Sequence, residues 1–295
     1  MSARDIALAI LITAIWGFNF VMIKVGLDAF PPLLFSALRF MAASLPFIFF
    51  VGRPGVPWRW ILIIGFMLGV VKFGLLFVGI YIGMPAGLAS LVLQTQAFFT
   101  AIFAIFLLGD RPRRTQVAGM VIAFAGVGLI ASSLPIDGAF AGLTLTVAAA
   151  AAWGLSNIAM KVARPPNMMA LIVWVSLVPP LPLLALSWWL EGPEAMSAAL
   201  ISIDLIGAGA LAYVAIVATV VGFGLWGYLL RTYSATLVAP FSLLVPIFGM
   251  SSAALFLGEE LTTAKLIAAA LVFAGLALTV LPRPAPPMAA SAGAD

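Results

Sequence analysis

Two copies of one nine-residue pattern carry aromatic and polar side chains that could bind a small solute. The copies span residues 16–24 and 153–161, and Trp, Gly and Lys recur in register at an offset of 137 positions (153 minus 16). On a helix, the residues three and four positions after each Trp lie on its face. A ring beside amides and a hydroxyl suits a small amphipathic solute, so we predict that both faces line a cavity. Their side chains are Trp16, Asn19, Trp153, Ser156 and Asn157.

These two faces have a second interpretation. Tryptophan is common where a membrane meets water, and an asparagine can hydrogen-bond a neighbouring helix. Because Trp16 and Trp153 fall near the middle of their predicted segments, away from the interface, we favour the cavity.

The stretch from 85 to 108 is the most polar of the apolar segments. Ser90 and Gln94 lie four residues apart and share a helical face, whereas Gln96 points about 200° away from Gln94. The two amides therefore cannot serve one small site unless the helix is distorted. An amide facing hydrocarbon is costly, so both should face protein or water. We predict that Ser90 and Gln94 contact the solute, with hydrogen bonding between helices as the alternative.

Four basic residues fall within or near the apolar segments. Lys24 and Lys161 lie close enough to helix ends to reach the interface, and we expect them to be structural anchors. Arg39 is expected to bond carbonyl groups or an acid such as Asp28. Lys72 lies in the middle of its segment, where an isolated cation indicates a function, such as attracting a carboxylate. Snorkelling or a bond to a carbonyl explains Lys72 equally well.

Several residue types used in catalysis and metal binding are missing. The chain has no Cys and no His, and the Asp residues that fall inside predicted segments, Asp5 and Asp204, stand at segment ends. Disulfides and thiolate metal sites are excluded, and the usual proton shuttle is absent. We therefore predict no cofactor, no metal and no enzyme activity, and facilitative transport as the simplest mechanism. Acids at segment ends, Asp28, Glu259 and Glu260, keep ion coupling open, and Tyr81 and Tyr213 are further candidates for the cavity wall.

Helices inside a membrane must position these side chains. Of the 295 residues, 64% are hydrophobic and 8% are charged, with a mean hydropathy of +1.23, whereas soluble domains carry about 25% charged residues. Only helices and closed barrels span a bilayer. The apolar runs are long and do not alternate, which selects helices. The predicted segments are 4–27, 32–52, 58–82, 85–108, 113–132, 139–162, 167–190, 204–230, 235–257 and 262–282.

The charges between the segments predict the orientation. With the first helix leading outward, the inner connections would hold Arg4, Arg53, Arg59, Arg111, Arg113, Arg114, Arg164, Arg231 and Arg283. The outer connections would hold Asp28, Asp137, Glu191, Glu194, Asp204, Glu259 and Glu260, with Lys265 as the exception. The positive-inside rule then places both termini in the cytoplasm. Residues 283–295 are rich in Pro, Ala and Gly, and we expect a disordered tail.

A longer repeat accompanies the first. Residues 86–127 align without a gap to residues 235–276 at an offset of 149 (235 minus 86), and Asp110 falls opposite Glu259. We predict two halves, 1–134 and 135–282, of five helices each. An odd number of helices puts the halves in opposite orientations, which is the inverted repeat of many secondary transporters.

The chain resembles the drug/metabolite transporter superfamily of EamA type, and within it the bacterial exporters of amino acids, including aromatic ones. The resemblance covers about residues 5–282 and implies ten helices in two inverted halves, a central cavity and export of small metabolites. Many members have a Pro near the middle of both the fourth and the ninth helix, but this chain has Ala97 and Pro246, which resembles the amino-acid exporter branch. The residues that carry the resemblance are the two Trp-Gly…Lys patterns, Leu38-Arg39-Phe40, Leu108-Gly109-Asp110 and Leu257-Gly258-Glu259.

These observations predict a multi-pass protein of the inner membrane that exports small neutral or zwitterionic metabolites, above all amino acids, by alternating access around a central cavity. Its partners would be the bilayer and a small-molecule substrate, with no nucleic acid. The first alternative is export of drugs, nucleosides or other metabolites by the same fold, with or without ion coupling. A channel or a non-transporting membrane protein is more distant, because a pore would show rings of charge or a carbonyl filter. The pattern leaves the oligomeric state open.

Overall fold

The computed structural model describes residues 1–134 and 138–280, and within these residues every regular element is helical. The predicted tail at 283–295, Asp137 and Arg283 lie outside the described residues. Among these described residues, eight helices are long and apolar enough to cross a membrane, and two further apolar helices, Pro32–Ser44 and Thr263–Thr279, are shorter. The prediction of an all-helical polytopic membrane protein is confirmed. The eight are Ala3–Ala29, Trp58–Tyr81, Ala86–Leu108, Arg114–Ser133, Gly138–Ala163, Met168–Leu190, Leu205–Thr232 and Ala239–Leu257.

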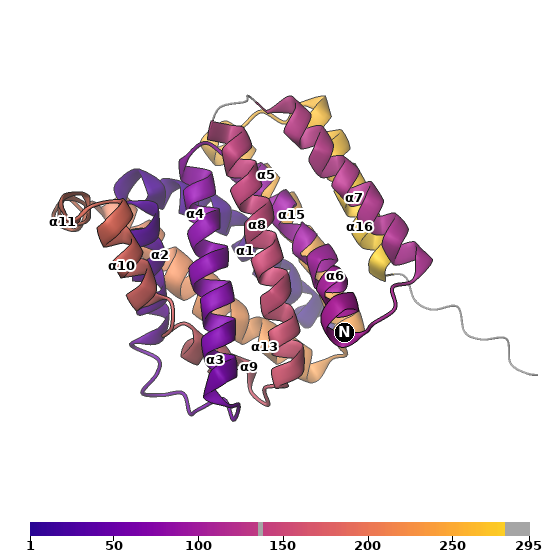
Figure 1. The fold of residues 1–295 in the computed structure, drawn as a ribbon, viewed down its shortest axis with the longest axis horizontal. Coiled ribbons are helices and arrows are strands. Elements are labelled where there is room, and N and C mark those ends of the chain that lie inside the picture. Colours follow the sequence, from indigo (N-terminus) through magenta and orange to yellow (C-terminus); the bar gives the residue numbers. More distant parts are fainter. Residues whose placement is uncertain (135–137, 281–295) are drawn as a thin grey trace, which may run out of the picture.

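Several of these long helices are built from shorter pieces (Figure 1). The elements of the first part of the chain are α1 (Ala3–Ala29), α2 (Pro32–Ser44), α3 (Trp58–Gly65), η1 (Phe66–Phe73), α4 (Gly74–Tyr81), α5 (Ala86–Val92), η2 (Leu93–Thr95), α6 (Gln96–Leu108) and α7 (Arg114–Ser133). Those of the second part are α8 (Gly138–Ala163), α9 (Met168–Val175), α10 (Pro180–Leu190), α11 (Pro193–Ile201), α12 (Leu205–Ala212), η3 (Tyr213–Val221), α13 (Gly222–Thr232), α14 (Ala235–Val238), η4 (Ala239–Leu243), α15 (Leu244–Leu257) and α16 (Thr263–Val280).

The second predicted segment, 32–52, is helical only as far as Ser44. Pro46 follows two residues later. Proline has no backbone N–H and disfavours a helical residue before it, so the chain continues from Leu45 to Phe50 as turns. Hydropathy alone does not register this break, because residues 45–51 remain apolar.

The same irregularities occur at two places in the chain. A π-helical segment, η1, interrupts the helix from Trp58 to Tyr81, and another, η3, interrupts the helix from Leu205 to Thr232. The 3₁₀ segments η2 and η4 precede α6 and α15. Both α6 and α15 end at a glycine in the left-handed conformation, with φ of 70° at Gly109 and 68° at Gly258. Glycine adopts this conformation without steric cost, which explains the repeated Leu-Gly-acid sequence as a helix end.

The glycines of the repeated Trp-Gly pattern let pairs of helices approach closely. A Cβ on Gly17 of α1 would lie 2.7 Å from the backbone nitrogen of Gly249 in α15. A Cβ on Gly154 of α8 would lie 2.9 Å from the backbone nitrogen of Thr100 in α6. α7 and α16 also pack together, as Figure 1 shows, and Gly119 faces Gly275 between them. These contacts follow the small-residue packing of membrane helices.

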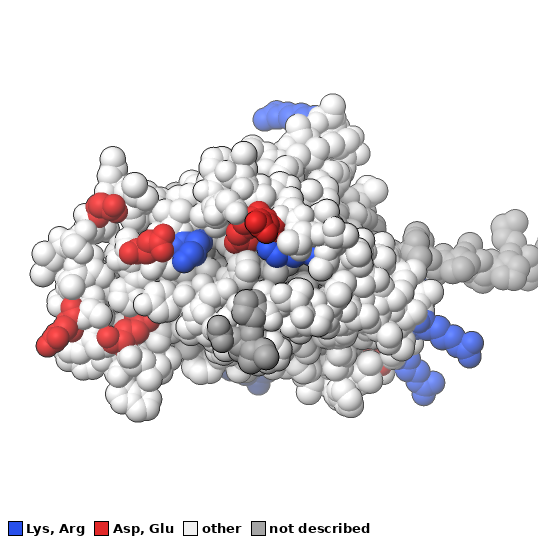
Figure 2. Space-filling model, turned by 90° about the horizontal axis from the view of Figure 1, so that it is seen from above, with Lys and Arg blue, Asp and Glu red and all other residues white. Residues whose placement is uncertain are grey.

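Large apolar side chains remain exposed around the bundle. Some of the most exposed are Phe49, Phe50, Phe106, Leu181, Trp189, Ile201 and Leu205. Soluble proteins rarely expose apolar surface on this scale, and lipid is the solvent in which it is stable. Figure 2 looks onto the end of the bundle where Asp and Glu side chains gather.

Candidate functional site

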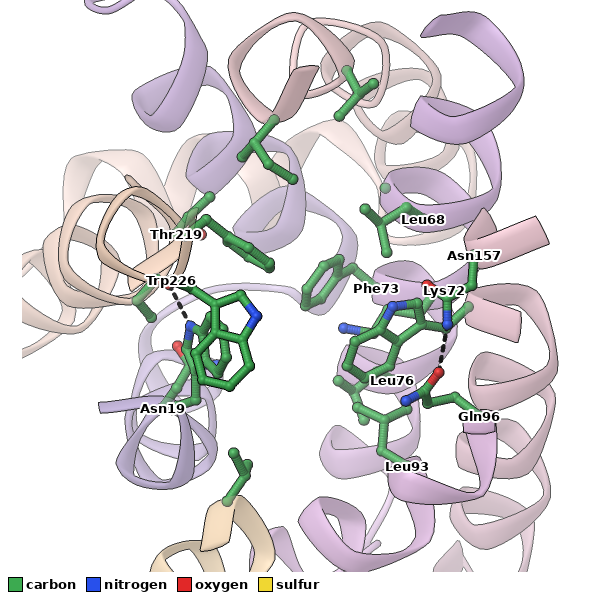
Figure 3. Close-up of a pocket in the computed structure, with 18 of the residues that line it drawn as sticks. Asn19, Leu68, Lys72, Phe73, Leu76, Leu93, Gln96, Asn157, Thr219 and Trp226 are labelled. Carbon is green, nitrogen blue, oxygen red and sulfur yellow. Dashed lines mark hydrogen bonds between the residues drawn. The ribbon is translucent and has the colours of Figure 1, made fainter. Parts of the chain in front are cut away.

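A cavity of about 340 Å³ lies inside the bundle and is lined mostly by apolar side chains (Figure 3). This volume is within the range of pockets that hold small molecules. α1, η1, η2, α8, η3 and α13 all contribute to its wall. Seven of the ten predicted site residues line it, namely Trp16, Asn19, Lys72, Ser90, Gln94, Trp153 and Asn157.

The two tryptophans of the repeated pattern have different surroundings in this cavity. Trp16 Nε1 donates a hydrogen bond to the carbonyl oxygen of Ala218 at 2.9 Å, and its ring centroid lies 5.1 Å from that of Phe223 and 5.2 Å from that of Trp226. Trp153 instead has the Lys72 ammonium 4.5 Å from its ring centroid. One tryptophan therefore belongs to an aromatic wall and the other to a charged wall.

Both glutamines of the polar stretch line the cavity. The helix is distorted there, because η2 is a 3₁₀ segment between α5 and α6. A 3₁₀ helix has three residues per turn, so each residue turns about 120° and Gln96 comes round to within about 120° of Gln94. The prediction that the two amides cannot serve one site applied only to an undistorted helix, and the distorted helix lets both line one cavity.

Asn157 holds Gln96 in place. Asn157 Nδ2 donates hydrogen bonds to Gln96 Oε1 at 2.5 Å and to Thr100 Oγ1 at 3.1 Å. Figure 3 shows this bond, with the nitrogen of the Gln96 amide on the side that faces the cavity. Sequence reasoning left Gln96 out of the site because the 3₁₀ segment cannot be recognised in an apolar stretch.

Two buried cations belong to the cavity wall. Lys72 is 4% exposed, and its ammonium lies 3.2 Å from the ring centroid of Phe73. Arg39 is 2% exposed, donates a 2.7 Å hydrogen bond to Thr219 Oγ1, and has its guanidinium carbon 4.0 Å from the same Phe73 centroid. The Arg39 Nε and NH1 groups have no hydrogen-bond partner in the described part of the chain.

The prediction that Arg39 bonds an acid such as Asp28 is wrong. Asp28 is exposed and pairs with Lys24 at 3.5 Å, one turn earlier on the same helix. Arg39 bonds the Thr219 hydroxyl and the face of Phe73 instead. Lys161, the other expected anchor, pairs with Asp110 at 3.0 Å.

Three predicted site residues lie outside the cavity lining. Tyr81 ends α4 and is 56% exposed. The Tyr213 hydroxyl donates to the carbonyl oxygen of Ile15 at 3.0 Å, which turns this ring toward α1. Ser156 is fully buried, and its hydroxyl has no hydrogen-bond partner among the described residues. It neighbours Asn157 in sequence but points about 100° away around the helix.

Carboxylates outside the cavity cap two helix starts. Glu259 accepts hydrogen bonds from the backbone nitrogens of Ala86 at 2.6 Å and Gly87 at 3.2 Å, where α5 begins. Glu191 accepts from Leu33 and Leu34 in the same way at the start of α2. Burial raises the pKa of the Glu259 carboxyl, and the two amide hydrogen bonds oppose that rise. Such bonds satisfy backbone donors that a helix leaves unpaired.

No group of three or more His, Cys, Asp or Glu side chains within residues 1–134 and 138–280 is placed to hold a metal ion. The polar groups of the cavity are amides, hydroxyls and the two cations. This set of groups can bind an amphipathic solute by hydrogen bonds, charge and aromatic contact.

The sequence matches the EamA-like transporter family over residues 4–132 and again over residues 140–281. The chain belongs to this family. It is 46% identical over 287 residues to a probable amino-acid metabolite efflux pump of Salmonella typhimurium, covering 95% of this chain and 96% of that protein. It is 44% identical to the protein of the same description in Escherichia coli, with the same coverage.

More distant proteins share the architecture. The uncharacterized inner membrane transporter YedA of Escherichia coli is 25% identical over 94% of this chain and 91% of that protein. One protein of known crystal structure superposes with a TM-score of 0.63 at 21% identity, covering 94% of this chain and 96% of that one. This likeness shows the fold alone. Together with the apolar helices, these matches make the chain a multi-pass membrane protein of a transporter family.

Proposed function

We propose that the protein exports small amino-acid metabolites across the bacterial inner membrane by alternating access around the cavity. The observation that carries the proposal is a cavity that joins aromatic rings, amides and buried cations at the centre of the bundle. The 44–46% identical relatives, described as probable amino-acid metabolite efflux pumps, support the substrate class and the direction.

The two ends of the cavity differ. Its lining extends to Met160 near the end of α8 and to Leu230 near the end of α13, just before the basic connections at Arg164 and Arg231. Toward the acidic end the lining stops at residues such as Leu76. Beyond it lie fully buried side chains, among them Phe77, Ile80, Met84 and Leu88. With the basic end in the cytoplasm, as the positive-inside rule favours, this packing supports a conformation that is closed toward the outside.

Two inverted halves would allow the cavity to open to each side of the membrane in turn. The paired π-helical segments, the paired 3₁₀ segments and the paired left-handed glycines support a division into five helices before residue 135 and five after it. The two separate matches to one family support it as well. In such proteins, rocking of one repeat against the other exposes a central site to each side in turn.

Transport by this cavity would not need an ion gradient. Among the described residues, no Asp or Glu lines the cavity, and the carboxylates of Glu191 and Glu259 are engaged in capping helices at the acidic end. The groups that usually carry protons or sodium through a membrane are thus held away from the solute. We infer facilitated export driven by the concentration of the solute itself.

Purified protein in liposomes provides the test. Liposomes loaded with a labelled amino-acid metabolite should lose the label faster when they contain the protein than when they are empty. The release should persist when proton and sodium gradients are collapsed. No acceleration for any member of a panel of amino acids and their acyl or oxo derivatives would contradict export, and strict dependence on either gradient would contradict facilitation alone.

A further inference from the structure

The geometry points to a carboxylate subsite formed by the Lys72 ammonium and the Gln96 amide nitrogen, which favours solutes with a carboxylate and an uncharged nitrogen or oxygen function over zwitterionic amino acids. The favoured class comprises N-acyl amino acids and 2-oxo or 2-hydroxy acids. This inference rests on the proposed function for its choice of solutes, and it narrows the sequence-based expectation of neutral and zwitterionic metabolites.

The first observation is an uncompensated charge. Lys72 and Arg39 are both almost fully buried and both line the cavity, whereas no acidic side chain of the described residues lines it. The face of the Phe73 ring is the shared neighbour of both cations. A ring face gives only part of the stabilisation that a buried cation needs. The Arg39 Nε and Nη1 donors are also left without a hydrogen-bond partner in the described part of the chain, so the positive charge of this wall is not balanced by an acidic side chain of the lining.

The second observation is the direction of the Gln96 amide. Asn157 Nδ2 can only donate, and it donates to Gln96 Oε1. The amide oxygen of Gln96 is thereby engaged, and its nitrogen is presented to the cavity on the wall that also holds Lys72 (Figure 3). A hydrogen-bond donor and a cation that face one cavity are together complementary to an oxyanion. A planar carboxylate accepts hydrogen bonds at both oxygens, so it can use the ammonium and the amide together.

The third observation concerns the other end of an amino acid. An ammonium two bonds from the carboxylate carbon would lie in the field of Lys72 and Arg39 without a carboxylate to neutralise it. The acceptors that the described lining offers are neutral, for example the side-chain oxygen of Gln94. An acylated nitrogen can donate to such an oxygen without carrying charge. Like-charge juxtaposition therefore discriminates against the zwitterion.

Binding to the purified full-length protein tests the subsite separately from transport. Four ligands with the same benzyl side chain can be compared by the shift they cause in melting temperature: phenylalanine, N-acetylphenylalanine, phenylpyruvate and phenylalanine amide. We expect both anions to bind at least about tenfold more tightly than phenylalanine, and the cationic amide to bind most weakly. Equal affinity for the anions and the zwitterion, or no binding of any of the four, would overturn the inference.

Gln96→Glu is the sharper variant, because it keeps the shape of the side chain and the acceptor for Asn157 while adding a negative charge beside Lys72. We expect it to weaken binding of the anions and to strengthen binding of phenylalanine, which reverses the preference. Lys72→Met should abolish the preference. Lys265→Met, which removes an exposed cation that bonds the Glu260 carbonyl oxygen, is the matched control and should leave the preference unchanged.

These outcomes separate the inference from the proposed function. Release from liposomes without a charge preference in binding would leave export standing and remove the subsite. A charge preference that reverses in Gln96→Glu, without release of any solute, would keep the subsite and contradict export. If Lys72→Met does not fold, a failure of Gln96→Glu to change the order of affinities still overturns the inference.

Discussion

The two copies of the Trp-Gly pattern lie in similar helices, yet they face different walls of one cavity. In both copies the glycine lets a neighbouring helix approach, with α15 against Gly17 and α6 against Gly154. The side chains around each tryptophan differ. Trp16 contacts Phe223 and Trp226, whereas the ring of Trp153 lies next to the ammonium of Lys72.

The asparagines differ in the same way. Asn157 fixes the direction of Gln96, while Asn19 Oδ1 makes no hydrogen bond within the described residues. The repeated residues therefore maintain the packing of the helices, and the residues that are not repeated determine the polarity. The repeat is accompanied by similar helix packing at its two glycines, but the neighbours of its two tryptophans in the cavity wall differ. A solute with one apolar and one anionic end suits the resulting asymmetry.

The largest expected effect comes from the feature that the two copies share. Gly17→Val would place a Cβ within 3 Å of three atoms of α15, two of which are backbone atoms that cannot move alone. Overpacking of this kind typically costs about 1–3 kcal/mol, so the melting temperature in detergent should fall clearly. Gly154→Val should behave in the same way. Gly128→Val is the control, because a Cβ there meets nothing within 4 Å, and an equal loss in this variant would contradict the close-packing explanation.

The second effect should separate the two asparagines. Asn157→Ala frees the Gln96 amide from its partner, and loss of a hydrogen bond of this kind costs about 0.5–1.5 kcal/mol. Solute release from liposomes should therefore slow by about 2- to 13-fold. The side-chain oxygen of Asn19 holds no other side chain in place, so Asn19→Ala should slow release less. Equal losses in the two variants would mean that Asn157 has no positioning role.

The third effect concerns the two tryptophans. Trp16→Phe loses the hydrogen bond to the Ala218 carbonyl oxygen, so it should lower the free energy of unfolding by about 1 kcal/mol and leave the affinity for carboxylates unchanged. Trp153→Phe retains a ring face for Lys72 but weakens the cation–π contact by about 0.5 kcal/mol. It should alter carboxylate affinity more than stability. Thermal melting with and without N-acetylphenylalanine distinguishes the two variants, and identical behaviour would contradict the division into two walls.

The smallest effect lies at the acidic end, where Glu259 and Glu260 are neighbours with different surroundings. Burial raises the pKa of the Glu259 carboxyl, so the folded protein holds this proton more tightly than the unfolded chain. The associated stability is fully present below the ordinary glutamate pKa of about 4.3 and declines as the pH rises through the raised value.

Glu259→Gln should therefore make the melting temperature less dependent on pH above about 4. Glu260→Gln is the matched control, because Lys265 bonds the backbone oxygen of Glu260 and not its side chain. A pH profile in Glu259→Gln that is identical to that of the unchanged protein would show that this carboxyl does not contribute.

Much of the fold could be predicted from composition and periodicity. Long apolar runs with few charges leave the helix as the only spanning structure, and each of the eight long helices in the described part of the chain overlaps a predicted segment. The end of the helix at Ser44 and the additional helix α11 were not predicted. Neither a proline nor a polar loop by itself determines whether the chain continues as a helix. The ends of α6 and α15 were recognised as repeated junctions, and glycine in the left-handed conformation is the physical reason.

The cavity was only partly predictable. The face containing Trp16 and Asn19 follows from helical spacing, and the structure places both residues in the lining. Gln96 was set aside because regular helix geometry turns it away, and the 3₁₀ segment reverses that result. Tyr81 and Tyr213 were selected by residue type alone, which does not indicate the direction of a side chain.

The sequence by itself determined the solvent, the helices and the helix ends at Gly109 and Gly258, because hydropathy and the conformational freedom of glycine act locally along the chain. Only the tertiary structure decided that Arg39 and Lys72 meet at Phe73, that Asn157 directs Gln96, and that acids cap helices instead of lining the cavity. Each of these depends on side chains brought together from different helices. The charge of the cavity, and with it the predicted class of solute, is therefore a property of packing that no single segment contains.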